Sequence, residues 1–111
     1  MISEIVVSTL ITELQKGIRK LDAFINGKLN HIPITMDLII YRFKKWNPEY
    51  PTAVGFVIVE LAQEGDYSIV QGMINQETNE VCTAVRIEAT DMGDKAKELL
   101  LNGKNVKIFP R

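Results

Sequence analysis

The sequence has few of the residues on which metal centres, disulfides and nucleophilic catalysis depend. Its 111 residues include one cysteine, Cys82, and one histidine, His31. A single cysteine excludes a disulfide within the chain, and a metal site needs several His, Cys or carboxylate ligands at close spacing. We therefore expect neither a metal nor a cofactor, and a reducing compartment such as the cytoplasm suits this composition.

An excess of charge and long apolar runs are also missing. With 13 basic and 14 acidic residues the net charge is −1, so nothing attracts the chain over long range to nucleic acid or anionic lipid. No apolar run approaches the ~20 residues of a membrane-spanning helix, and no basic stretch precedes an apolar run as in a secretory signal. We therefore expect neither nucleic acid nor a membrane as a partner.

What is present is the composition of a folded domain, 46% hydrophobic and 24% charged, and its length fits a single domain over residues 1–111. At the N-terminus apolar residues recur every three or four positions, which predicts one long helix over residues 2–26 that ends at Asn26-Gly27. This apolar stripe consists of Ile2, Val6, Leu10, Leu14, Ile18, Leu21 and Ile25. An alternative places a short strand at residues 2–7 and starts the helix near Thr9.

The rest of the chain is organised as strands separated by turn sequences. Apolar and polar alternation predicts four consecutive strands over residues 34–46, 52–62, 67–74 and 80–89. Asp91 is the expected N-cap of a short helix that ends at Asn102-Gly103, and residues 106–109 form an expected edge strand. The predicted fold is α+β: a long N-terminal helix packed on a four-stranded antiparallel sheet, with a short C-terminal helix and an edge strand.

A trial register follows from a two-residue turn at Glu64-Gly65, which pairs Leu61 with Ser68 and Val59 with Val70. It gives one apolar face, expected to receive the N-terminal helix, with Gly55 and Gly72 side by side where that helix approaches. The other face mixes apolar and charged residues, as self-association and ligand-binding surfaces do. Its candidate binding residues are Arg42, Phe56, Ile58, Glu60, Gln71, Met73 and Arg86.

Within this second face Glu60 and Arg86 fall on neighbouring positions, and we predict an ion pair between them. A homodimer is the simplest way to cover such a face, because two-fold symmetry is the commonest assembly. Another protein or a small apolar ligand is the other expected occupant.

The sequence gives little support for any catalytic residue. His31 lies in a loop with no obvious nucleophile beside it, and Cys82 lies in mid-strand, where cysteine behaves as a small hydrophobe. Residues 41–46 interleave aromatic and basic side chains as single-strand nucleic-acid platforms do, and a strand would group Arg42, Lys44 and Trp46 at one end. The sequence pI of about 5.8 argues against that function. We predict no catalytic residue.

The order of a helix followed by an antiparallel sheet resembles the hotdog arrangement of acyl-thioester hydrolases and dehydratases, and also the cystatin arrangement. The resemblance covers element order over most of the chain, and no family motif matches. The resemblance implies that a hotdog enzyme would carry an acidic or amide residue on its long helix at a dimer interface, for which Glu13 is the candidate. The predicted function is a small non-catalytic interaction or ligand-binding protein that self-associates through one sheet face; the alternative is a hotdog-like enzyme acting on acyl thioesters.

Overall fold

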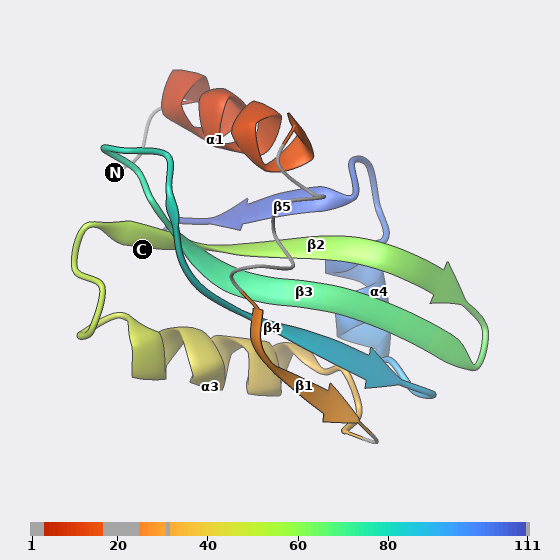
Figure 1. Ribbon diagram of the computed structural model, residues 1–111. Helices are drawn as coiled ribbons and strands as arrows, with labels where there is room; N and C mark the ends of the chain where they lie inside the picture. The colour runs from red at the N-terminus through yellow and green to blue at the C-terminus, as the bar shows by residue number, and fades with distance from the viewer. Residues whose placement is uncertain (1–3, 17–24, 31, 111) are drawn as a thin grey trace.

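The computed structural model describes residues 4–16, 25–30 and 32–110, with the backbone alone at positions 26, 28 and 30. Its elements in chain order are α1 (Glu4–Lys16), β1 (Ile25–Asn30), α3 (Met36–Trp46), β2 (Ala53–Gln63), β3 (Asp66–Asn75), β4 (Val81–Ala89), α4 (Asp94–Leu100) and β5 (Val106–Phe109) (Figure 1). The predicted α+β class is confirmed, with a helix near the N-terminus, four antiparallel strands, a short C-terminal helix and an edge strand.

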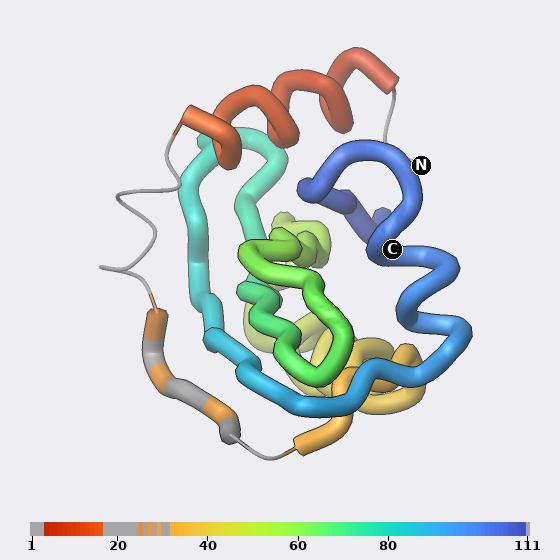
Figure 2. Tube along the Cα trace, turned by 90° about the vertical axis from the view of Figure 1, so that its right-hand side faces the viewer, coloured from red at the N-terminus to blue at the C-terminus, as the bar shows by residue number. Residues whose placement is uncertain are grey.

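The strands form a five-stranded sheet in the order β1-β4-β3-β2-β5. Strands β4, β3, β2 and β5 pair antiparallel, whereas β1 is added at the edge in parallel with β4. Figures 1 and 2 show α1 on one side of the sheet and α3 on the other. Helix α4 packs in the same core as α3. The sheet therefore lies between a layer formed by α1 and a layer formed by α3 and α4.

The strand predicted over residues 34–46 is wrong, because residues 36–46 form helix α3. Thr35 is an N-cap in extended backbone conformation, and its hydroxyl accepts the N–H of Leu38 at 3.3 Å, which satisfies a donor that a helix leaves unpaired. The buried residues of α3 are Met36, Ile39 and Phe43, which have helical spacing. Of the apolar residues that alternation divided between two strand faces, Met36, Ile39 and Phe43 form the inward stripe of this helix, whereas Leu38, Ile40 and Tyr41 are exposed.

The helix over residues 4–16 agrees with the preferred prediction, whereas two further boundaries differ from it. Residues 4–7 are helical, so the alternative strand at 2–7 is not found over these positions; residues 1–3 and 17–24 of the predicted helix lie outside the described residues. The predicted helix end at Asn26-Gly27 is wrong, because both residues belong to β1, where pairing with β4 overrides the local glycine signal. Asp91 is not the cap of α4: Gly93 is the N-cap, and the Asp91 carbonyl accepts the N–H of Ile34.

The predicted turn and the pairing of Leu61 with Ser68 are confirmed, but Val59 pairs with Ile69 and not with Val70. The register shifts between Val59 and Leu61, so Glu60 is the extra residue of a β-bulge. Because side chains alternate between faces, one extra residue exchanges the faces of all positions beyond it. The two predicted faces are therefore mixed in the structure.

Each face of the sheet has its own core. The core under α1 consists of Leu10, Leu14, Val54, Phe56, Ile58, Val70, Ile74, Ala84 and Val106. The core under α3 and α4 includes Ile39, Phe43, Val57, Ile69, Met73, Ile87, Ala96 and Leu100. Both faces are thus covered by helices of the same chain, and neither is the open face that the sequence predicted.

The two glycines expected side by side under the N-terminal helix lie against different neighbours. A Cβ atom on Gly55 would come within 2.5 Å of the Phe43 ring of α3, whereas one on Gly72 would meet the Phe56 ring at 2.6 Å and the Thr83 carbonyl. Close approach is therefore the reason for both glycines, but only Gly55 admits a helix side chain, and that helix is α3.

Candidate functional site

The predicted binding residues of the sheet do not share a face. Phe56 and Ile58 pack in the core under α1, and Met73 packs in the core under α3 and α4. These three side chains and Gln71 are at most 1% exposed. In the described structure they are interior residues, and no face made of them is open to a partner.

The predicted ion pair between Glu60 and Arg86 is confirmed. Arg86 Nε lies 2.7 Å from Glu60 Oε1 and Nη2 lies 3.0 Å from Oε2, and Ser68 Oγ donates to Oε1 at 3.3 Å. The two charged side chains are 27% and 29% exposed, so solvent screens the pair to roughly 1 kcal/mol. The pair joins the bulge residue on β2 to β4 across β3.

Gln71 and Arg42 form the main polar contact inside the layers. The Gln71 amide donates to the Ile39 carbonyl at 2.8 Å, and its Oε1 accepts from Arg42 Nη1 at 2.6 Å. Burial lowers the pKa of Arg42, but a guanidinium keeps its charge at any ordinary pH. The arrangement satisfies a buried amide and fixes α3 on β3, which is a structural role.

The grouping of Arg42, Lys44 and Trp46 predicted for a strand end is wrong, because the segment is helical. Successive residues of a helix turn by about 100°, so alternate positions do not share a side. Arg42 is directed to Gln71, Lys44 is exposed, and Trp46 is half-buried against the core of α3. The basic and aromatic side chains therefore do not form one stacking platform.

The candidate nucleophile Cys82 is half-buried on β4. Burial raises the pKa of its thiol and the charge of Glu80 raises it further, while a backbone hydrogen bond at Asn75 opposes them. A catalytic thiol needs the opposite shift, toward the thiolate. His31 lies outside the described residues, and among those described no group of three or more His, Cys, Asp or Glu residues is placed to hold a metal ion.

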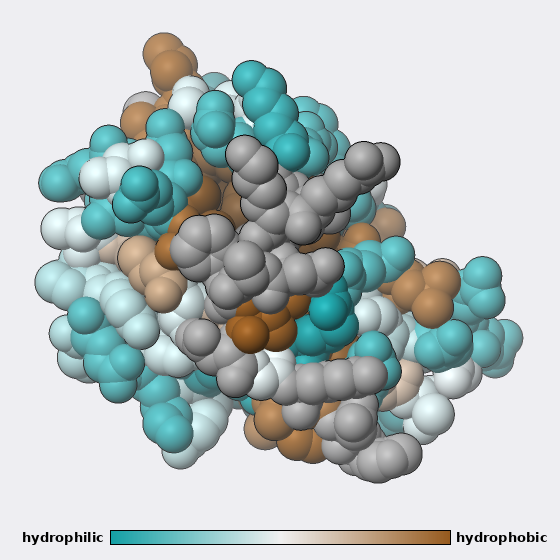
Figure 3. Space-filling view, in the orientation of Figure 1, coloured by the Kyte–Doolittle hydropathy of each residue, from teal (hydrophilic) through white to brown (hydrophobic). Residues whose placement is uncertain are grey.

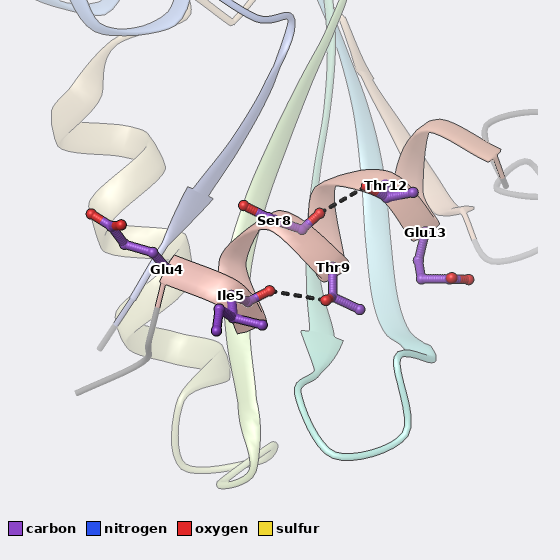
Figure 4. Close-up of a pocket in the computed structure, with 6 residues that line it drawn as sticks. All are labelled: Glu4, Ile5, Ser8, Thr9, Thr12 and Glu13. Atoms are coloured by element: carbon purple, nitrogen blue, oxygen red, sulfur yellow. Dashed lines mark hydrogen bonds between the residues drawn. The ribbon is translucent and has the colours of Figure 1, made fainter.

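A shallow hollow of about 470 Å³ runs along the outer side of α1 (Figure 4). It is lined by Glu4, Ile5, Ser8, Thr9, Thr12 and Glu13. The hydroxyls of Thr9 and Thr12 donate to carbonyls one turn earlier, both at 2.9 Å, and are thus engaged within the helix.

The two carboxylates of this hollow, Glu4 and Glu13, are separated by roughly 13 Å of helix axis, which is too far for them to act on one bond. Glu13 is exposed on α1. The acyl-thioester alternative stays a prediction that this geometry does not favour.

Apart from Ile5 of α1, which is 80% exposed, most of the large exposed apolar residues in the described structure belong to α3 or to α4 and its C-cap. Tyr41 is 62% exposed, and it is accompanied by Leu38, Ile40, Leu99 and Leu101. The two helices start side by side, because Gly93 N–H donates to the Ile34 carbonyl at 2.8 Å just before each helix begins. We call the exposed apolar residues of α3, Leu38, Ile40 and Tyr41, the outer helical surface.

Sequence reasoning missed the outer helical surface because a strand over 34–46 placed Tyr41 in the core. The helical spacing of Met36, Ile39 and Phe43 was the available signal, since it leaves Tyr41 on the outside.

In Figure 3 the visible apolar atoms form small groups among polar ones, and hydrophilic side chains dominate the lower left, where α3 ends.

Among the described residues, no helix is long and apolar enough to cross a membrane. In comparisons with protein-family models, curated proteins and solved structures, no significant match to the chain was found.

Proposed function

We propose that the protein is a small non-catalytic interaction protein that docks a protein partner on the outer helical surface. The observation that carries this proposal is the 62% exposure of Tyr41 on α3, with Leu38 exposed on one flank of the helix and Ile40 on the other. Tyrosine supplies a large apolar area and a polar tip, and it is enriched where proteins meet.

The helical layer replaces the sheet face as the proposed contact surface. A partner on either sheet face would have to displace α1, or α3 and α4, from cores whose residues are almost fully buried. Binding to the outer helical surface requires no displacement of a helix, because its side chains are already exposed. A reducing compartment such as the cytoplasm stays the proposed location, supported by the single cysteine.

The test is retention of protein partners on the immobilised full chain. We expect a partner, which includes an untagged copy of the chain itself, to be retained by the wild type and lost with Tyr41→Glu. The matched control is Ile5→Glu, because Ile5 is 80% exposed on α1, away from the surface in question. The retained protein is then purified and its affinity measured. If Tyr41→Glu and Ile5→Glu retain the same proteins with the same affinity as the wild type, the proposal is wrong.

A further inference from the structure

Two of the three exposed charges of α3 lie at equal distances on either side of Tyr41, and the third, Lys44, lies beside Lys45. Asp37 lies four residues before Tyr41 and Lys45 four residues after it, and all three of these residues are exposed. Residues four apart are neighbours on one side of a helix, so this line presents an acid, an aromatic ring and a base over about 12 Å. The half-buried Arg42 is held by Gln71, so it does not add to this outward line.

Such a line is complementary to a second copy of itself. When two α3 helices lie antiparallel with Tyr41 at the crossing point, Asp37 of each copy faces Lys45 of the other, and the two rings meet. A parallel arrangement would instead place like charges together. Two-fold symmetry produces the antiparallel contact twice from the same surface, which is the definition of an isologous interface.

We infer that the partner of the outer helical surface is a second copy of this chain, with the two α3 helices antiparallel about a two-fold axis at Tyr41. The inference rests on the proposed function and gives its partner. In a single copy Lys45 Nζ lies 5.9 Å from the centre of its own Tyr41 ring; in the dimer it turns to Asp37 of the second copy. One face of an 11-residue helix is small for an interface, so the association is weak and depends on concentration.

The same charges also suit the helix dipole within one chain, since Asp37 lies in the first turn of α3 and Lys45 in the last. The interaction with the helix dipole takes place within one chain, so it does not depend on the charges of a second copy. Reversing the charges in one copy and then in the other therefore separates the helix-dipole explanation from ion pairs between copies.

The experiment measures self-association of four full-length proteins by sedimentation: wild type, Asp37→Lys, Lys45→Glu and the double variant. In each single variant both ion pairs become repulsive, and we expect at least about tenfold weaker self-association. An equimolar mixture of the two single variants restores both attractive pairs in a heterodimer, and the double variant restores them in a homodimer. Circular dichroism of each variant checks that the helices are retained.

A cross-link tests the position of the axis. In a Cys82→Ala background, Tyr41→Cys forms a disulfide-linked dimer on mild oxidation, whereas the exposed control Ile5→Cys does so at least about tenfold more slowly.

Three results overturn the inference: a wild type that remains monomeric at high concentration, charge variants whose mixture and double form do not recover association, or equal cross-linking at Tyr41 and Ile5. The proposed function survives these results if a different protein is still retained in a Tyr41-dependent manner. It fails with the inference if no Tyr41-dependent partner exists.

Discussion

The bond between Arg42 and Gln71 gives the sharpest test of how α3 is held on the sheet. Arg42→Met leaves the buried Gln71 Oε1 without its 2.6 Å donor, and Gln71→Leu removes both of the hydrogen bonds that the amide makes. A hydrogen bond to a charged group contributes ~1.5–3 kcal/mol, and a buried acceptor without a partner costs ~1–3 kcal/mol. Arg42 is only half-buried, which favours the lower part of these ranges.

We expect each single variant to lose about 2 kcal/mol of unfolding free energy. In the double variant two apolar side chains meet and no polar atom of the pair is left buried, so its loss is smaller than the sum of the single losses. The coupling energy of the cycle is then about 1.5 kcal/mol.

Urea unfolding of the four proteins measures these free energies, and unchanged m-values show that the comparison is valid. Arg42→Lys is the control for charge, because a lysine keeps the charge without the planar fork of donors. A coupling energy below ~0.5 kcal/mol, the ordinary error of additivity, would refute the view that this bond holds α3 in place.

Two other predictions follow from packing and from the thiol. Gly55→Ala places a methyl group against the Phe43 ring and should cost ~1–3 kcal/mol of unfolding free energy, whereas Gly27→Ala, which has open space around its Cβ position, should cost clearly less; equal losses in urea unfolding would contradict this. The raised pKa of Cys82 means that the native state keeps the thiol proton to higher pH than the unfolded state, so this contribution to stability is present below the ordinary thiol pKa and is lost as pH rises through the folded-state pKa. Wild type should lose more stability than Cys82→Ala across that alkaline range, and native Cys82 should react with a disulfide reagent more slowly at neutral pH than the unfolded chain does; parallel pH profiles or equal reaction rates would count against it.

The part of the fold that local sequence specifies was predicted. Strand β4 has a period-2 pattern, and β3 begins directly after the turn at Glu64-Gly65, which contains a glycine at φ 80°, so the positions of both strands followed from the local sequence. The edge strand at residues 106–109 was also placed correctly.

Two errors have physical causes that the sequence does not display clearly. Exposed Leu38, Ile40 and Tyr41 blur the helical stripe of α3, so the segment fits strand alternation as well as helical spacing. The N-cap at Thr35 is a second helix signal beside the spacing of the buried residues. The bulge at Glu60 involves no glycine, and its clamp to Arg86 is a tertiary contact. The ion pair was predicted correctly, but the faces around it were exchanged.

The candidate surface was missed for the same reason as α3. The surface consists of the residues that the packed elements leave exposed. When a helix is predicted as a strand, its exposed residues are therefore assigned to the core. Gln71 shows the converse error: a polar residue assigned to an open face is at 0% exposure, because Arg42 and the Ile39 carbonyl satisfy its amide.

The parallel pairing of edge strand β1 with β4 constrains the order in which the strands of the nascent chain can pair. Leu29 has its strand partner at Ile87, so a ribosome must deliver most of the protein before this early segment finds its neighbour. The hairpins β2–β3 and β3–β4 join segments that are adjacent in sequence and close only short loops. The first strand to be synthesised is therefore among the last to be paired.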